Sequence, residues 1–159
     1  MSFKWLKILT LLIVCLVSPK SYALEDAEVS AFADFIRVLI DTAPGSRRGS
    51  VCFFGSDEIS SALLSQDGKI IDLNNNPEKF TSCKAIYVAS GAAKVLKPEI
   101  AKFSKNKILT IAIFDGFTEI GGMVQVQMWR INFELILNSK AMKEAGIRLN
   151  SLAMSLVVN

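Results

Sequence analysis

The sequence of 159 residues contains no histidine. Histidine is the usual base of Ser-His-Asp and Cys-His nucleophile systems, a common ligand in catalytic zinc sites and the main proton relay near neutral pH. Its absence excludes those mechanisms and disfavours most hydrolase functions. We therefore expect a protein that is not an enzyme.

The chain also lacks a charge excess once its N-terminus is set apart. Three of its 18 basic residues, Lys4, Lys7 and Lys20, lie in the first 23 residues, which contain no acidic residue. The other 136 residues carry 15 Lys and Arg against 15 Asp and Glu, so their formal charge is zero. A neutral surface has no long-range attraction to phosphate backbones or anionic lipids. We therefore expect no nucleic-acid partner and no polybasic membrane binding.

Residues 1–23 have the three parts of a secretory signal peptide. Lys4 and Lys7 precede an apolar run at residues 8–17, and Ser21-Tyr22-Ala23 resembles an A-x-A cleavage site. As a helix the run spans only about 15 Å, against the ~30 Å of a bilayer core, which disfavours a retained anchor. No later segment approaches 18 uncharged apolar residues. We expect a signal peptide over 1–23 and a mature domain over 24–159, without stable membrane insertion and periplasmic in a Gram-negative host.

Cysteine is scarce, with three in the chain. Cys15 lies in the signal peptide, which leaves Cys52 and Cys83 in an oxidising compartment, where two cysteines suit one disulfide. Such a bond closes a loop of about 30 residues and is worth roughly 3 to 4 kcal/mol on the chain-entropy model. The alternative is a pair of reactive thiols or metal ligands, but two thiolates without histidine are too few for a closed zinc site. No metal is expected.

The mature residues alternate between helical and strand patterns. Apolar residues at three- and four-residue steps predict a first helix over residues 24–40, followed by a turn at Pro44-Gly45. Period-two alternation over residues 123–137 predicts a hairpin that turns near Trp129-Arg130. Dense apolar runs predict strands at 50–54, 69–73, 83–89 and 108–114. Further helices are expected at 56–64 with Ser56 as the cap, at 91–104 with a break near Pro98, and at 138–145 with Asn138 as the cap.

This order of elements predicts the fold class. Strands that alternate with helices and end in a hairpin indicate an α/β fold, a single three-layer Rossmann-like mixed sheet with helices on both faces and a C-terminal antiparallel hairpin. Residues 147–158 are expected to close the chain as strand or irregular structure. Four aromatic residues are assigned to the core: Phe53, Phe54, Trp129 and Phe133.

Cofactor motifs are missing from the turn after the first strand. Gly55-Ser56-Asp57 supplies one glycine where a dinucleotide fingerprint needs three and a phosphate loop needs Gly-Lys-Ser/Thr, so no cofactor is expected. Asp115 with Glu119 is the one carboxylate pair in a plausible loop. Such a pair could perform acid/base chemistry or hold a hard cation, but a solvated turn is the favoured interpretation. Gly116, Gly121 and Gly122 suit a chain that turns between strands with positive φ angles.

The sequence from residue 108 onward carries a resemblance to a known family. Its motifs are Gly116-Phe117, Gly121-Gly122-Met123, Phe133-Glu134 and Ala145-Gly146, preceded upstream by Cys52 to Gly55 and by Cys83 before an apolar strand. In these features the chain resembles the YfiR family of small exported bacterial proteins, over essentially the whole mature chain. It departs from the family pattern at Asp41-Thr42-Ala43-Pro44, where an aromatic Trp-Pro end of the first helix is common, and it lacks the second cysteine pair of some members.

The resemblance implies a periplasmic regulator. Family members are similar in binding the periplasmic domain of an inner-membrane diguanylate cyclase and restraining it, which lowers cyclic di-GMP signalling, with release tied to an outer-membrane lipoprotein and to envelope or redox state. A homodimer is compatible with the resemblance. The candidate recognition loop comprises Asp115, Gly116, Phe117, Glu119, Gly121 and Gly122, and we expect its backbone shape to matter more than its charges. The alternative is a periplasmic small-ligand-binding protein with its crevice near Gly55 and Asp115.

Overall fold

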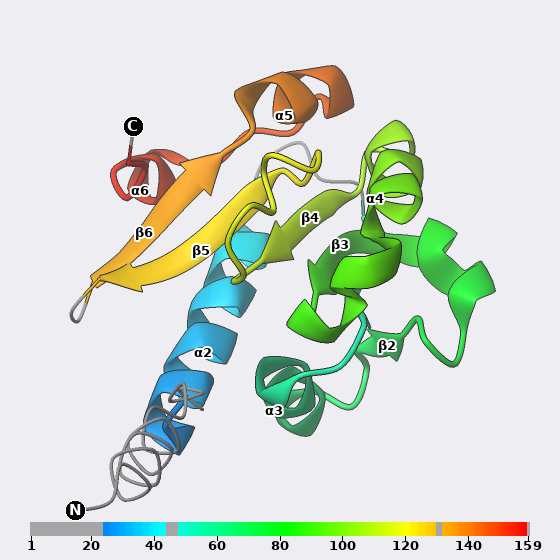
Figure 1. Cartoon of the computed structure of the whole chain (residues 1–159), viewed down its shortest axis with the longest axis horizontal. Helices are drawn as coiled ribbons and strands as arrows, with labels where there is room; N and C mark the ends of the chain where they lie inside the picture. Colours follow the sequence, from blue (N-terminus) through cyan, green and yellow to red (C-terminus); the bar gives the residue numbers. More distant parts are fainter. Residues whose placement is uncertain (1–23, 44–47, 130–131, 159) are drawn as a thin grey trace, which may run out of the picture.

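A six-stranded mixed sheet organises the molecule (Figure 1). The computed structural model describes residues 24–43, 48–129 and 132–158. The signal peptide at 1–23 and the turn at Pro44-Gly45 lie outside the described residues. The strands are β1 (Ser50–Phe54), β2 (Ile71–Asp72), β3 (Cys83–Val88), β4 (Leu109–Ala112), β5 (Val124–Trp129) and β6 (Asn132–Leu137), in the spatial order β2-β1-β3-β4-β5-β6.

The first five strands in this order are parallel, and β6 pairs antiparallel with β5. The hairpin register places Trp129 opposite Asn132 and Val124 opposite Leu137, so its turn falls where period two in the sequence predicts it. Arg130 itself lies outside the described residues. An α/β mixed sheet with a C-terminal antiparallel hairpin is thereby confirmed.

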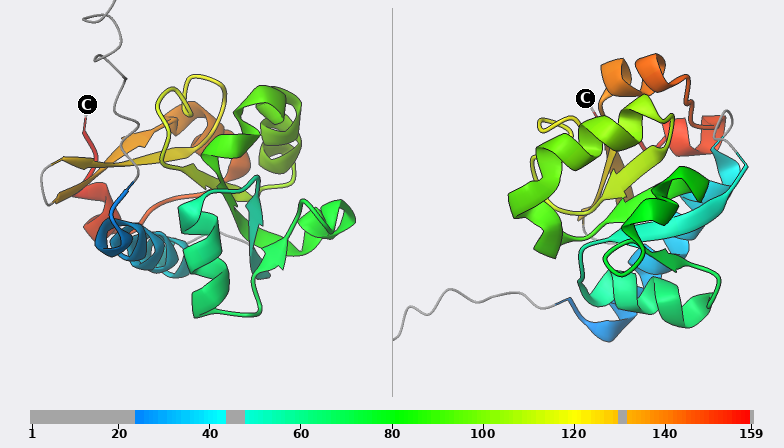
Figure 2. Two further views of the ribbon diagram at one scale, coloured as in Figure 1. Left: turned by 60° about the horizontal axis from the view of Figure 1, so that its bottom comes forward. Right: turned by 90° about the vertical axis from the view of Figure 1, so that its right-hand side faces the viewer.

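Helices cover both faces of the sheet (Figure 2). Those on the first face are α2 (Asp26–Thr42), α3 (Glu58–Gln66) and α6 (Ser151–Met154), and α4 (Leu96–Lys105) packs on the second. The α5 helix (Ser139–Ala145) follows β6, and the 3-10 turns η1 (Pro77–Ser82) and η2 (Ser90–Val95) flank β3. The apolar stripe of α2 is buried as its spacing predicts: Val29, Phe32, Ala33, Ile36, Leu39 and Ile40.

Two apolar cores lie on opposite sides of the sheet because successive strand residues point to opposite faces. Phe53, Tyr87 and Val126 pack toward α2 and α3. Cys52 and Ile86 point the other way, into the core under α4. The three-layer arrangement predicted from the sequence is therefore present.

The predicted disulfide joins Cys52 of β1 to Cys83 at the start of β3, with 5.9 Å between their Cα atoms. Both residues are fully buried in the core under α4. Because β1 and β3 are neighbouring strands, the bond joins two adjacent strands of the sheet covalently.

Several local predictions are wrong. Asp57, not Ser56, caps α3, because its carboxylate accepts the Ser60 amide at 2.8 Å and the Ser60 hydroxyl accepts the Asp57 amide. The β2 strand has two residues where five were expected. Residues 151–154 form α6, capped by Asn150. Trp129 is 64% exposed at the hairpin end and does not belong to the core.

The last residues of the chain return to the sheet. The Leu135 amide of β6 donates to the Leu156 carbonyl at 2.8 Å, and the Val158 amide donates to the Leu135 carbonyl at 2.9 Å. These bonds form a short parallel bridge between Leu135 and Val157 on the outer side of β6. The expectation of strand or irregular structure for 147–158 is thus met only in part.

Candidate recognition site

The recognition loop predicted from the sequence, residues 115–123, takes the place of a crossover helix. Parallel neighbours such as β4 and β5 are usually joined through a helix packed on the sheet, but here residues 113–123 pass over the second face without one (Figure 1). Phe117 is fully buried in the core under α4 and stacks edge-on against Phe114 at 5.3 Å between ring centroids. The loop is therefore part of the core.

Two buried polar side chains of the sheet hold this loop. Thr110 and Gln125 point toward the second face and are 0% and 3% exposed. The Thr110 hydroxyl accepts the Met123 amide at 3.0 Å, and the Gln125 side-chain oxygen accepts the Phe117 amide at 3.2 Å. A buried polar group of a sheet without such a partner would cost roughly 1 to 3 kcal/mol. Their placement under the loop explains why β4 and β5 carry polar residues on a buried face.

The loop requires its three glycines for two different physical reasons, backbone conformation and close packing. Gly116 and Gly121 have φ angles of 77° and 106°, as the sequence predicts. Gly122 is not among the glycines with positive φ, so that part of the prediction is wrong. A Cβ atom at Gly122 would instead collide with the buried Phe117 ring, and glycine is required there by close packing.

The two carboxylates of the loop do not form an acid/base pair. Asp115 and Glu119 are exposed, and Asp115 accepts a long hydrogen bond from the Gln125 side-chain amide at 3.4 Å. Across the described ranges, no group of three or more Cys, Asp or Glu residues is arranged to hold a metal ion. The carboxylates can contact a partner, but they have no base or third ligand beside them.

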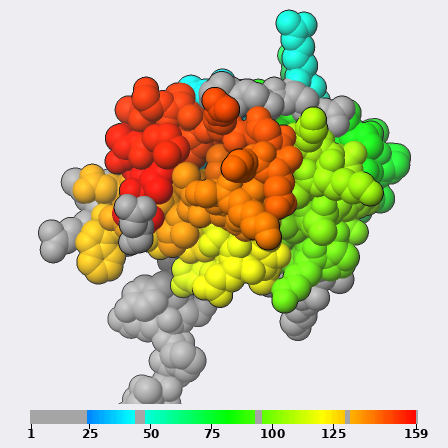
Figure 3. All heavy atoms as spheres, turned by 90° about the horizontal axis from the view of Figure 1, so that it is seen from above, coloured from blue at the N-terminus to red at the C-terminus, as the bar shows by residue number. Residues whose placement is uncertain are grey.

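The loop forms one wall of a surface groove with α4 and α5. Figure 3 shows the loop, α4 and α5 meeting on one face of the molecule. The groove has a volume of about 540 Å³. Sequence reasoning missed it, because its walls come from three segments far apart in the chain. It is lined by Lys97, Ile100, Ala101, Ser104, Lys105, Lys107, Ile120, Gly121, Asn138, Lys140, Ala141 and Glu144.

The backbone packs closely at Gly55, where the small-ligand alternative expects a crevice. A Cβ atom on Gly55 would lie 2.7 Å from that of Ala92, and one on Gly91 would lie 2.8 Å from the Ser56 carbonyl oxygen. The η2 turn therefore packs its backbone against the end of β1. An apolar pocket of about 280 Å³ lies beside it, between η1 and α4, and is lined in part by Phe54, Phe80 and Phe103.

Asp57 joins the ends of β1 and β3, a role that the sequence analysis missed. One carboxylate oxygen caps α3, and the other accepts the Tyr87 hydroxyl at 2.8 Å and the Ser90 amide at 3.1 Å. Burial raises the pKa of the Tyr87 phenol far above its ordinary value, and the charge and hydrogen bond of Asp57 raise it further. Tyr87 therefore remains a neutral donor. The spacing Asp57-x-x-Ser60 is the sequence signal that could have indicated the cap.

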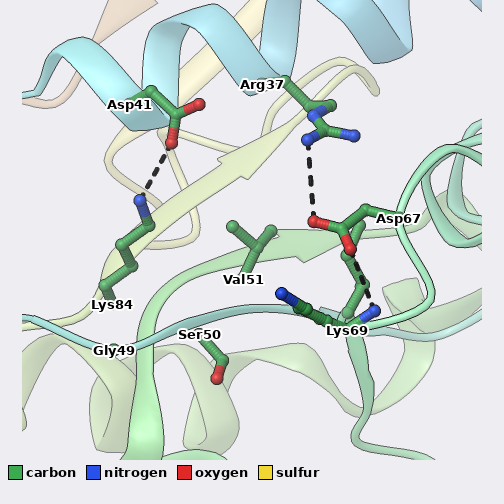
Figure 4. Close-up of a pocket in the computed structure, with 9 residues that line it drawn as sticks. Arg37, Asp41, Gly49, Ser50, Val51, Asp67, Lys69 and Lys84 are labelled. Atoms are coloured by element: carbon green, nitrogen blue, oxygen red, sulfur yellow. Dashed lines mark hydrogen bonds and ion pairs between the residues drawn. The ribbon is translucent and has the colours of Figure 1, made fainter.

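A second, charged pocket of about 360 Å³ lies where α2, the start of β1 and the segment after α3 meet (Figure 4). Arg37 pairs with Asp67 at 3.6 Å, and Lys84 pairs with Asp41 at 2.9 Å. Most of the charged side chains in the pocket are therefore paired with one another, and the pairs link α2 to its neighbours. Since ligands of parallel sheets bind at the carboxyl ends of strands, a pocket at the start of β1 is better explained as a structural contact.

The domain resembles solved structures of low sequence identity. A conserved domain protein from Vibrio cholerae aligns with a TM-score of 0.62 and 9% identity over 82% of this chain and 59% of its own. An ABC domain in complex with L-Trp from Streptococcus pneumonia aligns at 0.55 with 12% identity, over 82% and 60%. A substrate binding protein with adhesive properties from Clostridium difficile, in its ligand-free, open form, aligns at 0.54 with 14% identity, over 79% and 58%.

These likenesses concern the fold alone, and the chain spans about three fifths of each solved structure. No curated protein matches the sequence. The fold and the site define a small α/β domain with a loop anchored in the core and a groove lined by four lysines. Residues 22–157 match the model of the YfiR/HmsC-like family, and the chain belongs to this family.

Family membership confirms the resemblance seen in the sequence and makes the protein a periplasmic regulator in general terms. Among helices within the described residues, none is long and apolar enough to cross a membrane.

Proposed function

We propose that this protein restrains an inner-membrane diguanylate cyclase by binding its periplasmic sensor domain, and thereby lowers cyclic di-GMP signalling. The observation that carries the proposal is the family match over residues 22–157, which covers every described residue except Val158. In this proposal residues 1–23 direct export and are then removed.

The physical features of the domain support regulation by binding. An inhibitor shifts a receptor between two states only by the difference in its affinity for them, so it requires a well-defined surface and no chemistry. The loop 115–123 is held by Thr110, Gln125 and the buried Phe117 ring, which fixes its shape before a partner arrives. Preorganisation of this kind reduces the entropy lost on binding.

The proposal includes two further contacts. An outer-membrane lipoprotein relieves the inhibition by competing for the regulator, and a second copy of the chain is a candidate partner in a homodimer. The small-ligand alternative is less favoured, because the η2 backbone packs closely against Gly55, where part of its crevice was expected.

Deletion of the gene tests the proposal. We expect the deletion strain to contain more cyclic di-GMP and to attach more strongly to surfaces, and a plasmid copy of the full chain to restore both values. A copy that lacks residues 1–23 is the matched control, and it should fail to restore them because it stays in the cytoplasm. Unchanged cyclic di-GMP in a strain that normally expresses the protein would contradict the proposal.

A further inference from the structure

Four lysines surround the groove between α4, α5 and the loop 115–123. Lys97, Lys105, Lys107 and Lys140 are all exposed, and Glu144 is the one acidic residue that lines the same groove. Within the described parts of the chain, none of these lysines forms an ion pair, whereas Lys84 and Lys102 elsewhere do. The mature sequence has equal numbers of basic and acidic residues, so this groove holds a local excess of positive charge.

Two of these lysines occupy positions that the local backbone does not favour. Lys107 has a φ angle of 58°, a left-handed conformation just after α4 where glycine is the usual residue. Lys140 is the second residue of α5, where the helix dipole favours an anion. The backbone conformation at Lys107 and the dipole at the start of α5 therefore do not account for a lysine at either position.

Apolar side chains also line the groove. Ile120 and Ala141 are partly exposed there, and Ala101 is exposed. Cations at the rim beside apolar side chains suit carboxylates that are attached to a peptide chain.

We infer that this groove is the docking site for an acidic segment of the partner protein. The segment places its carboxylates against Lys105, Lys107 and Lys140 and contacts the loop at Ile120 and Gly121. The inference rests on the proposed function for the partner's identity, the periplasmic domain of the cyclase. The excess of positive charge at the groove does not depend on that identity.

The first test uses a hexaglutamate peptide with the chain purified from the periplasm. We expect amide NMR shifts to change at Ser104, Gly121 and Ala141, and the changes to weaken as salt is raised because these charges are exposed. A hexaglutamine peptide is the control and should cause no change. If hexaglutamate leaves these amides unchanged, or if only phosphatidylglycerol vesicles shift them, the inference is overturned.

The second test measures binding to the purified periplasmic domain of the cyclase. Lys105→Gln with Lys140→Gln should weaken binding between about twofold and thirtyfold, since exposed ion pairs contribute modestly. Lys69→Gln with Lys79→Gln removes the same charge from exposed positions outside the groove and should leave the affinity unchanged. Equal affinities for the two double variants would overturn the inference.

Lys107→Gly separates binding from folding. Glycine relieves the left-handed backbone at this position, so the variant should melt a few degrees higher while it binds the acidic partner less tightly. A variant that is more stable and binds as well as the wild type contradicts the role of Lys107.

The outcomes distinguish the two proposals. If hexaglutamate occupies the groove but the cyclase domain does not bind the wild-type chain, the inference that the groove binds acidic segments is upheld and the proposed function fails. If the cyclase domain binds and the groove variants bind equally well, the proposed function stands and the groove inference fails.

Discussion

At the scale of single residues, Tyr87 and Asp57 show how one buried contact serves two elements. The Tyr87 side chain is fully buried, and its hydroxyl donates to the carboxylate that also caps α3. A neutral donor beside an ionised acceptor gives a strong hydrogen bond, and ionised tyrosine could not make it. The contact therefore depends on the protonation state of the phenol.

The raised pKa of Tyr87 predicts a loss of stability at alkaline pH. In the unfolded chain tyrosine ionises near pH 10, whereas burial and Asp57 keep the folded phenol protonated well above that value. The stabilisation that depends on the protonated Tyr87 phenol is therefore complete below about pH 9, and it falls by about 1.4 kcal/mol between pH 9 and 11.

Urea unfolding at pH 9 and pH 11 measures this loss. Tyr87→Phe cannot ionise, so its stability should fall about 1.4 kcal/mol less than that of the wild type over the same interval. The other titrating groups are common to both proteins and cancel in the comparison. Identical falls would show that Tyr87 does not carry the effect.

The loop 115–123 predicts opposite results for two kinds of substitution. Asp115→Asn with Glu119→Gln should change the free energy of unfolding by no more than about 0.5 kcal/mol, because both side chains are exposed. Cyclase restraint should be nearly unchanged. Gly122→Val should cost about 1 to 3 kcal/mol or more and weaken restraint, because its side chain would overlap the buried Phe117 ring.

Thermal midpoints and cyclic di-GMP levels measure both effects. Gly68→Val is the matched control, since a Cβ atom at Gly68 meets nothing within 4 Å and its φ is not positive. It should be close to neutral. If the double amide variant loses restraint at full stability, the two carboxylates have a functional role that the structure does not indicate.

At the scale of elements, the disulfide connects β1 to β3 at the centre of the sheet. Cys52→Ser should lower the free energy of unfolding by roughly 2 to 5 kcal/mol, the usual cost of losing a native disulfide in a small secreted domain. Denaturation curves with and without a reducing agent measure the change. Thiol labelling of the unreduced, denatured wild type should find no free thiol at either position.

A double variant with Cys52→Ala and Cys83→Ala provides the control for an unpaired thiol. It should be destabilised by a similar amount, and reducing agent should then have no effect on it. Two labelled thiols in the wild-type protein isolated from the periplasm would show that the bond does not form there.

The elements predicted from the sequence are those with local signals. The stripe of α2 and the alternation of β5 and β6 follow from helical and strand periodicity, which a short window contains. The extent of β2 depends on its pairing with β1, and only Cys52 and Phe53 have partners there. The α6 helix is four residues long and is stabilised by packing, so its sequence carries no such pattern.

At the scale of the whole molecule, the sequence predicts the loop but not the groove. Sequence patterns report neighbours along the chain, whereas the groove is formed by segments that only the fold brings together. Gly116 and Gly121 are adjacent in sequence to the turn that requires them, so composition reveals them. Lys97 and Lys140 are brought together only by the packing of α4, α5 and the loop. Trp129 has a strand-like setting, and only the position of the hairpin end shows that it is exposed.

The return of the chain's last residues to β6 has a consequence for how copies of this domain behave when crowded. An open sheet edge offers amide and carbonyl groups to which a strand from another molecule can add, and such addition leads to fibrils. Here the chain's own end occupies the middle of that edge at Leu135, and the opposite edge is the two-residue β2. Both edges of the sheet therefore offer little backbone to which a strand from another copy could add, which disfavours polymerisation.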